Sequence, residues 1–519
     1  MKRLFLYVAA LLPVLLAPAA GACAQELYRP GTEAAANGPG NIRYGSACAS
    51  RLEYNPTQEF GYASLGYSSS GGDFHPVDGA DRTNALEIFM GGLEKMKNVL
   101  AAGFLEYRNA SENGRRWNSS TGTDPLNPFF VADSIAGKSS TEAFRMAAEL
   151  SFAIADGWHA GLSTGLSVSQ LSDNTDPRPR SNLSAIPVCM GLDFQPWQSV
   201  RLGAFAGVEI KSERMTYTVV SSGNNHQYFV MKGLGDYFRS SSLAEQGYNR
   251  ECFALKPSFG INFQVNGGRW KYFAEAAYAS GTEKSSSEQG KFKAGDYSSS
   301  EVSLHNRFSA ERGNVLHNIT LDASITNGEG WWYEQKKLTD TEHGSTTYYD
   351  VLSKDKIHVC SALDAVLAYR CNLQRSAFLA SAGFRSEQVT HYNDSGAHGM
   401  SVNMATLRCE AMTGGIRAGA VSLLASGKLE TMLPAGDNSF EGACNYVGEA
   451  NIDTVYTEPL CSYKSTGRWG AGIRIDATIP ASSAAPAGIA GLFVSASSVF
   501  AFGGKGRFTS LGTGIYLNF

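Results

Sequence analysis

Apolar and polar residues alternate along most of the chain, in segments of about ten residues or more. In 253–265 the odd positions carry large apolar side chains such as Phe259, whereas the even positions carry small or polar residues such as Asn262. The turn signal Asn266-Gly267-Gly268-Arg269 follows, and the alternation resumes over 270–278. Because a period of two is typical of β-strands with one apolar face, this stretch predicts a hairpin.

The same alternation recurs over 144–168, 186–210, 357–369 and 469–479. Strands of soluble sandwiches usually have only about 5–6 residues, whereas barrel strands in a membrane need about ten. The face opposite the apolar one carries Gly, Ser and Ala with an occasional charge, which is typical of a barrel lumen. The pattern therefore favours a membrane barrel over its alternative, a secreted soluble β-protein.

Short turns such as Asp156-Gly157 exchange with long polar stretches, an arrangement typical of outer-membrane barrels with short periplasmic turns and long extracellular loops. Between a first strand near 57–67 and a last strand at 507–519 we expect about eighteen strands, with fourteen or sixteen as alternatives. The predicted fold is an all-β, antiparallel, up-and-down transmembrane barrel. The expected loops are 109–140, 171–183, 211–250, 281–300, 326–350, 386–400 and 432–467.

Residues 1–24 have the features of a signal peptide. Lys2 and Arg3 precede an apolar run, and a small-residue site ends at Ala24, after which we expect cleavage. A lipoprotein signal ending at Cys23 is the alternative. We expect residues 25–56 to be a periplasmic leader or a small plug, and residues 57–519 to be the barrel.

Composition narrows the class of protein further. Charged residues make up 18% of the chain and aromatic residues 11%, which excludes a disordered chain. Without the signal peptide, 42 basic residues (44 minus Lys2 and Arg3) face 48 acidic ones, a net charge of −6. The absence of a basic field predicts no nucleic-acid partner.

The C-terminus carries a second targeting feature. Gly514, Leu517 and Phe519 resemble the signal that the outer-membrane barrel insertion machinery reads, although Gly512 stands where that signal usually has a polar residue. The expected partners are therefore this machinery and outer-membrane lipid, and the expected location is the bacterial outer membrane.

Short loop motifs add a resemblance to a known family. Together with the terminal strand, Asp124-Pro125-Leu126-Asn127-Pro128-Phe129 and Asp176-Pro177-Arg178-Pro179 make the mature chain similar to an uncharacterised family of outer-membrane barrels from Bacteroidota. The resemblance implies fold and location, and little about activity.

Two motifs raise the question of catalysis. Gly161-Leu162-Ser163-Thr164-Gly165 matches a nucleophile elbow, but that motif works at a strained strand-to-helix turn, whereas here it falls inside a predicted strand. His343-Gly344-Ser345 superficially resembles the His-x-Ser of barrel lipases, but it lies in a polar stretch and lacks the following Asn-Gly. We therefore expect no enzyme and no cofactor, and keep a barrel hydrolase as a remote alternative.

The spacing of the cysteines does not match a metal-binding pattern. Cleavage after Ala24 leaves eight cysteines without a Cys-x-x-Cys pair, so no metal site is predicted. Cys444 and Cys461 bracket much of one expected loop, and an exported compartment permits a disulfide between them.

Charges on the predicted inner face are the main functional candidates, and both signs are present. We expect a passive channel or uptake pore for small polar solutes. The alternative is a structural or interaction barrel with a filled lumen, acting through its extracellular loops. Within 211–250, the aromatic residues Tyr228, Phe229, Tyr237 and Phe238 predict either an inward fold or a cover over a surface ligand. The predicted lumen-lining residues are Arg145, Glu149, Arg201, Glu209, Lys256, Lys271, Glu275, Asp364, Arg474 and Asp476.

Overall fold

The computed structural model describes residues 46–54, 59–122, 124–220, 228–239, 248–340, 346–373, 376–443, 451–480, 488–504 and 506–518. The predicted signal peptide and its cleavage site near Ala24 lie outside these residues. In the described part of the chain, no helix has the length and hydropathy needed to cross a membrane.

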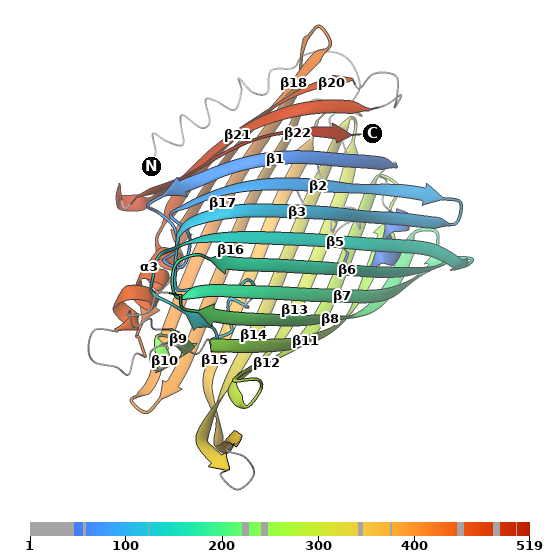
Figure 1. Ribbon diagram of the computed structural model, residues 1–519. Helices are drawn as coiled ribbons and strands as arrows, with labels where there is room; N and C mark the ends of the chain where they lie inside the picture. Colours follow the sequence, from blue (N-terminus) through green and yellow to red (C-terminus); the bar gives the residue numbers. More distant parts are fainter. Residues whose placement is uncertain are drawn as a thin grey trace.

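Eighteen antiparallel strands form one closed barrel, in which each strand pairs with the next along the chain and the first pairs with the last (Figure 1). Closure is made by β1 and β22, from Tyr62 opposite Asn518 to Gly72 opposite Phe508. The predicted fold and strand number are confirmed. The barrel strands are β1 (Phe60–Gly72), β2 (Arg82–Met96), β3 (Val99–Arg115), β5 (Gly137–Ala155), β6 (Trp158–Asp173), β7 (Arg178–Trp197), β8 (Val200–Thr218), β11 (Tyr248–Asn266), β12 (Trp270–Ser287), β13 (Phe292–Arg312), β14 (Val315–Asp340), β15 (Thr346–Asn372), β16 (Ser376–Asn393), β17 (Gly396–Ala418), β18 (Val421–Pro434), β20 (Arg468–Pro480), β21 (Ile489–Ala501) and β22 (Arg507–Asn518).

The two ends of the barrel differ in their connections. One end, here called the short-turn end, has tight turns such as Asp156-Gly157, where Gly157 adopts a positive φ of 73°. Strand β1 begins and β22 ends at this end, on the right in Figure 1. The opposite, long-loop end carries the connections 116–136, 219–247 and 435–467.

Four stretches that were expected as loops are mostly strand, so those predictions are wrong. Strands β6 and β7 include 171–173 and 178–183, and β12 and β13 include 281–287 and 292–300. Strands β14 and β15 include 326–340 and 346–350, and β16 and β17 include 386–393 and 396–400. Other expected loops are shortened in the same way, because strands such as β3 and β8 continue into them. These strand ends lie beyond the apolar part of the barrel, where water replaces lipid outside. Their alternation therefore loses the contrast that marks a membrane strand.

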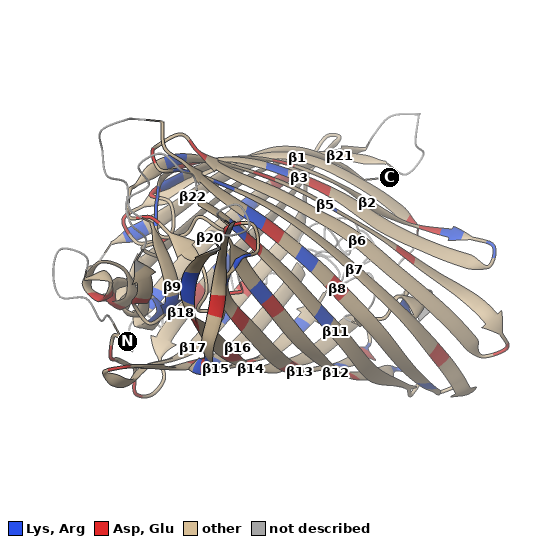
Figure 2. Cartoon of the chain, turned by 60° about the horizontal axis from the view of Figure 1, so that its bottom comes forward, with Lys and Arg blue, Asp and Glu red and all other residues tan. Residues whose placement is uncertain are grey.

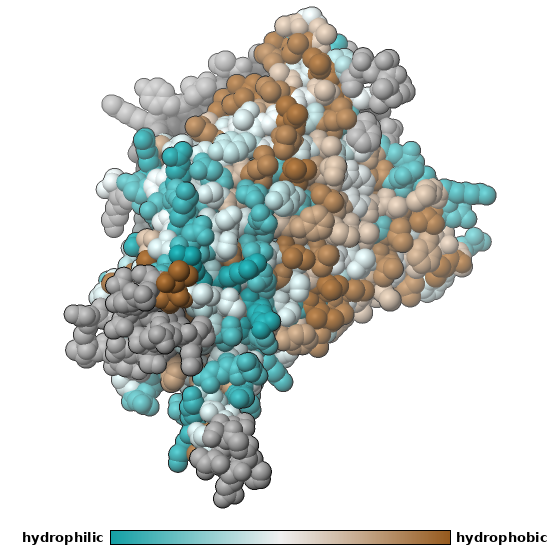
Figure 3. Space-filling view, viewed as in Figure 1, coloured by the Kyte–Doolittle hydropathy of each residue, from teal (hydrophilic) through white to brown (hydrophobic). Residues whose placement is uncertain are grey.

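A belt of exposed apolar side chains surrounds the half of the barrel near the short-turn end. Ile261 is 66% exposed and Leu202 is 47% exposed, and both point away from the lumen. Figure 3 shows this belt in brown, with a hydrophilic outer surface in teal toward the long-loop end. We call the two parts the belt half (200–210 of β8 and 253–266 of β11) and the projecting half (211–218 of β8 and 248–252 of β11).

Segments from the long connections fold into the projecting half. Strands β4 (Val131–Ala132), β9 (Phe229–Gly233) and β10 (Asp236–Arg239) form a small separate sheet. The third connection contributes β19 (Ser439–Phe440), the π-helical turn η4 (Asp453–Thr457) and helix α3 (Glu458–Ser465). We call the described parts of these connections, 116–136, 228–239 and 435–466, the mouth plug. At the short-turn end, the 3-10 helix η3 (Ala49–Tyr54) lies against the inner wall.

Candidate functional site

All ten charged residues predicted to line the lumen lie on inward-facing positions of their strands. On β5, Glu149 is 2% exposed and shares its face with Ser151, which contacts η3, whereas Leu150 and Ile154 belong to the outer belt. The same parity holds on the other strands. The residues placed on the inner face are Arg145, Glu149, Arg201, Glu209, Lys256, Lys271, Glu275, Asp364, Arg474 and Asp476.

Five of these ten charges form an ion pair with a charge of opposite sign. Arg145 lies 2.8 Å from Glu106 of β3, and Lys256 lies 2.8 Å from Glu301 of β13. Arg474 binds Asp476 on its own strand at 2.9 Å. Figure 2 shows basic and acidic positions interspersed along the strands. Because signs alternate, the wall is polar without a strong net field.

These ion pairs are exposed to solvent, unlike the side chains of a packed core. The side chain of Arg145 is 56% exposed, and Asp364 and its partner Arg385, 3.7 Å away, are 49% and 53% exposed. Exposed ion pairs stabilise a fold by only about 0–1 kcal/mol each. These side chains therefore line a hydrated wall.

Sequence reasoning missed a second group of wall charges. Arg408 binds Glu410 at 2.7 Å on β17, and Lys428 binds Glu430 at 2.8 Å on β18. In register, Arg408 lies opposite Glu430 and Glu410 opposite Lys428. Their spacing of two residues was the available signal, but strand assignments in 401–431 were too uncertain to use it.

The described N-terminal segment, 46–54, occupies part of the lumen at the short-turn end. Arg51 is 1% exposed, and its Nη2 lies 2.8 Å from Oδ1 of Asp193, which is fully buried. The guanidinium also donates to Asn262 and Gln264. Near the start of the segment, the Glu275 carboxylate accepts hydrogen bonds from Ser46 and from the backbone N–H of Ala47.

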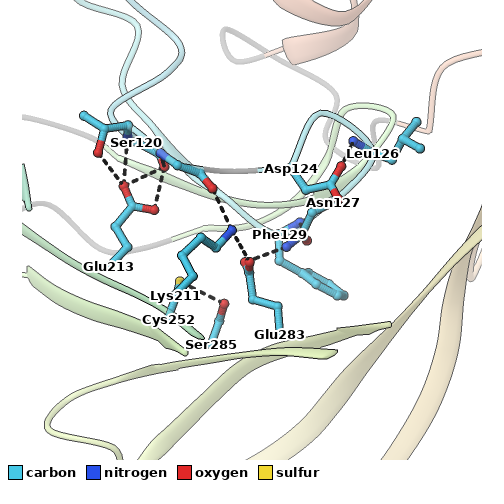
Figure 4. Close-up of polar contacts among 12 residues, drawn as sticks. Ser120, Asp124, Leu126, Asn127, Phe129, Lys211, Glu213, Cys252, Glu283 and Ser285 are labelled. Carbon is cyan, nitrogen blue, oxygen red and sulfur yellow. Dashed lines mark hydrogen bonds and ion pairs between the residues drawn. The ribbon is translucent and has the colours of Figure 1, made fainter. Parts of the chain in front are cut away.

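Polar contacts hold the first loop of the mouth plug against the wall, as Figure 4 shows. Glu213 accepts hydrogen bonds from Oγ of Ser120 at 2.7 Å and from the backbone N–H of Thr121 at 2.8 Å. Lys211 donates to the carbonyl of Gly122 at 2.7 Å and forms an ion pair with Glu283 at 2.8 Å.

Glu283 and Arg250 continue this line of contacts. Glu283 accepts a hydrogen bond from Nδ2 of Asn127 at 2.7 Å. Arg250, which is 2% exposed, donates from Nη2 to Oγ of Ser285 at 2.7 Å and to the carbonyl of Phe129 at 2.5 Å. Wall residues of β8, β11 and β12 thus hold one loop along much of its length.

An apolar cluster lies between the plug and the wall of the projecting half. The Phe129 ring packs directly over Gly295, where a Cβ atom would approach the ring to 2.6 Å, so the contact requires a glycine. Burial of this cluster excludes water from the contact between the plug and the wall. Its plug members include Phe129, Val131, Val230, Leu234 and Ala443, and its wall members include Met215, Tyr217, Tyr248, Trp332, Val402 and Met404.

The hairpin of β9 and β10 is fixed by a buried carboxylate. Asp236, which is 2% exposed, accepts a hydrogen bond from Nε2 of His391 at 3.0 Å and pairs with Lys232 at 2.9 Å. Burial alone would raise the pKa of Asp236, but the His391 and Lys232 contacts outweigh it and lower this pKa. Phe229 and Tyr237 are 4% and 2% exposed, which confirms the inward fold among the two predictions for this segment.

The remaining predicted positions fall in three places. Gly514 pairs with Gly66 inside the closing seam, and Leu517 faces outward at 39% exposure. Cys461 is buried, but Cys444, Phe519 and His343 lie outside the described residues. Ser163 lies within regular strand β6 opposite Glu149, so the strained turn of a nucleophile elbow is not formed there.

Together these features define a closed β-barrel with an apolar outer belt, a charged inner wall and a mouth filled by its own loops. The chain belongs to DUF6850, a family of unknown function, which matches residues 49–518. The Bacteroidota source stays a prediction. A search of curated proteins found no significant match.

Solved structures with a similar fold are distant. The ferric preacinetobactin receptor BauA from Acinetobacter baumannii shares 8% identity over 89% of this chain and 80% of its own, with a TM-score of 0.42. The RagAB peptide transporter shares 8% identity over 89% and 86%, with a TM-score of 0.39. The outer membrane transporter YddB from Escherichia coli shares 8% over 89% and 80%, also with a TM-score of 0.39. At these scores the likeness carries no argument about what this chain does.

Proposed function

We propose that the protein is an outer-membrane pore for small polar solutes, whose extracellular mouth is closed at rest by the mouth plug. The apolar belt supports a membrane position, because the outer surface of a membrane barrel faces lipid. Closure of the barrel supports it too, because lipid admits only strands whose backbone groups are all paired. Short turns at one end and long connections at the other support a periplasmic short-turn end and an extracellular long-loop end.

One observation carries the proposal: charged side chains on the inner wall remain about half exposed although the mouth plug packs against that wall. Arg145, Asp364 and Arg385 are 56%, 49% and 53% exposed. A lumen filled for structural reasons would bury such ion pairs, whereas these pairs stay about half exposed to water. Hydrated walls of mixed sign suit the passage of polar solutes.

Release of the plug is the proposed opening step. The loop at 116–136 is joined to the wall by hydrogen bonds to Glu213 and Glu283, and water can replace these bonds once the loop leaves the wall. Each bond to a buried charged group contributes about 1.5–3 kcal/mol. The apolar cluster adds to this, so the closed mouth is the resting state.

The second candidate is an interaction barrel whose lumen stays filled and whose loops bind a partner. The buried pair of Arg51 with Asp193 favours it, because this contact holds a further segment in the lumen at the short-turn end. We propose no catalytic role, since Ser163 lies in a regular strand.

Single-channel recording in planar bilayers tests the two candidates. We expect wild type to open rarely and the double variant Glu213→Ala, Glu283→Ala to show long open steps. Glu251→Ala is the matched control, because Glu251 lies in the same region on the outer face, 55% exposed and paired with Arg214. The control should behave as wild type.

Selectivity of the open variant identifies the pathway. Neutralising Arg145, Arg201 and Lys256 together should increase its preference for cations, because three positive charges leave the wall. Silence of the release variant, in protein with barrel circular dichroism, would contradict the pore and favour the filled barrel.

A further inference from the structure

Two buried histidines lie side by side on the inner wall where the β9–β10 hairpin docks. His358 of β15 and His391 of β16 are 4% and 0% exposed, and they lie opposite each other in register. Their ring centroids are 6.2 Å apart. The outer face at this level carries the ion pair of Lys356 with Glu329, in which both side chains are about half exposed. The two histidines therefore lie beyond the apolar belt, at the level of the mouth plug.

The mouth plug covers both rings. A Cβ atom on Gly233 of the hairpin would lie 2.8 Å from Nδ1 of His358 and 2.9 Å from Nδ1 of His391, so the close fit requires a glycine. Pro128 of the loop 116–136 packs beside the same point. Because the histidines belong to the inner wall, the plug is what separates them from the water of the lumen.

His358 is held in its neutral form by this environment. His391 bonds to Asp236 through Nε2, but neither ring nitrogen of His358 has a well-aligned hydrogen-bond partner among the described residues. The backbone of Leu126 offsets only part of the cost of burial. Burial and the neighbouring His391 lower the pKa of His358 to about 3.

The carboxylates around His358 have basic partners of their own. Lys232 pairs with Asp236 at 2.9 Å, and Lys464 pairs with Glu387 at 2.6 Å. Asp124 is attracted to Lys211. A proton on His358 would therefore add a buried positive charge that no nearby acid is free to balance in the described part of the chain. The titratable groups that face this place are His391 and Glu387 of β16, Cys360 of β15, Lys232 and Asp236 of the hairpin, Asp124 of the first loop and Lys464 of α3.

We propose that protonation of His358 releases the β9–β10 hairpin from the wall, so that mild acid opens the mouth. This inference rests on the proposed function, in which the mouth plug closes a pore. Once the plug is released, the inward-facing imidazole meets water and regains its ordinary pKa near 6.5. Neutral His358 therefore stabilises the closed mouth above pH 6.5, and this stabilisation is lost as the pH falls from there toward 3.

Hydrogen exchange of the full-length protein in lipid vesicles, corrected for the intrinsic pH dependence of amide exchange, tests this inference. We expect the protection of 228–239 in wild type to fall about tenfold or more from pH 7 to pH 5. Asp236 does not contribute over this range, because its lowered pKa keeps it ionised. His358→Phe and His358→Gln cannot take up a proton, so their protection should be the same at both pH values.

His75→Gln is the matched control. His75 lies at the same end of the barrel, in the connection between β1 and β2, and pairs with Asp81 at 3.1 Å. Its variant should keep the pH dependence of wild type. Constant protection in wild type, or an equal fall in both His358 variants, would overturn the inference. Conductance at the two pH values is a separate readout: a fall in protection without open steps at pH 5 would contradict the pore but not the release of the hairpin.

Discussion

The belt half and the projecting half of the barrel are built from the same strands, but their large apolar residues point to opposite sides of the wall. On β8, Leu202 and Ile210 point outward and are 47% and 43% exposed in the belt half. Further along the same strand, Met215 and Tyr217 point inward and are 3% and 1% exposed, while Arg214 faces outward. The apolar face changes sides without any shift in register.

This reversal follows from what surrounds each half. In the belt half lipid lies outside, and water and the polar contacts of segment 46–54 lie inside, so large apolar residues face outward. In the projecting half water lies outside and the mouth plug lies inside, so the strands resemble those of a soluble protein with a packed core. The same period of two therefore has opposite meanings at the two ends of one strand.

The largest expected effect comes from a truncation in the plug. Phe129→Ala removes a ring that is 1% exposed and leaves a cavity, which should cost about 3–5 kcal/mol of plug docking. Hydrogen exchange of the 116–136 amides would measure this. Phe259→Ala, at a belt residue that is 59% exposed, should cost much less, since lipid fills the space. Equal losses would break the distinction between the halves.

A charge placed on the outer face should lower the free energy of unfolding in the belt half much more than in the projecting half. Ile261→Arg puts a guanidinium against lipid and should cost about 2–4 kcal/mol in the free energy of unfolding. Thr218→Arg faces water at the end of β8, where a substitution should change stability by no more than about 0.5 kcal/mol. Urea unfolding in lipid vesicles gives both values. A large cost at Thr218 would place lipid around the projecting half.

Acid should weaken the plug by a smaller amount. The pKa of Asp236 is lowered in the folded state, so its contribution is present above the ordinary value near 4 and is lost as pH falls below it. The groups facing Asp236 are Lys232 and His391, with His358 of β15 beside His391. We expect the β9–β10 hairpin to lose about 1–3 kcal/mol of docking in strong acid.

Hydrogen exchange of residues 228–239 as a function of pH measures this loss. In Asp236→Asn the step near pH 4 should disappear, and the hairpin should be less protected at neutral pH. If the step persisted in that variant, another group would hold the hairpin.

Strand number and the direction of the wall charges could be predicted, because the belt half keeps a strong contrast between its faces. Residues such as Arg145 and Asp364 were assigned inward from this parity alone. The contrast fades in the projecting half, and 326–350 was therefore expected to be loop although 326–340 and 346–350 are strand. The contacts of Ser120 and Thr121 with Glu213 depend on how one loop folds back onto β8, which no periodicity encodes.

Spin-label accessibility can measure whether lipid and water exchange sides between the belt half and the projecting half. In a cysteine-free background that still folds as a barrel, single labels would replace Ile261, Arg214, Arg385 and Val402 in turn. We expect the label at position 261 to collide with oxygen dissolved in lipid. The labels at positions 214 and 385 should collide with a water-soluble nickel complex, and the label at position 402 should collide with neither. Oxygen contact at 214, or no nickel contact at 385, would contradict it.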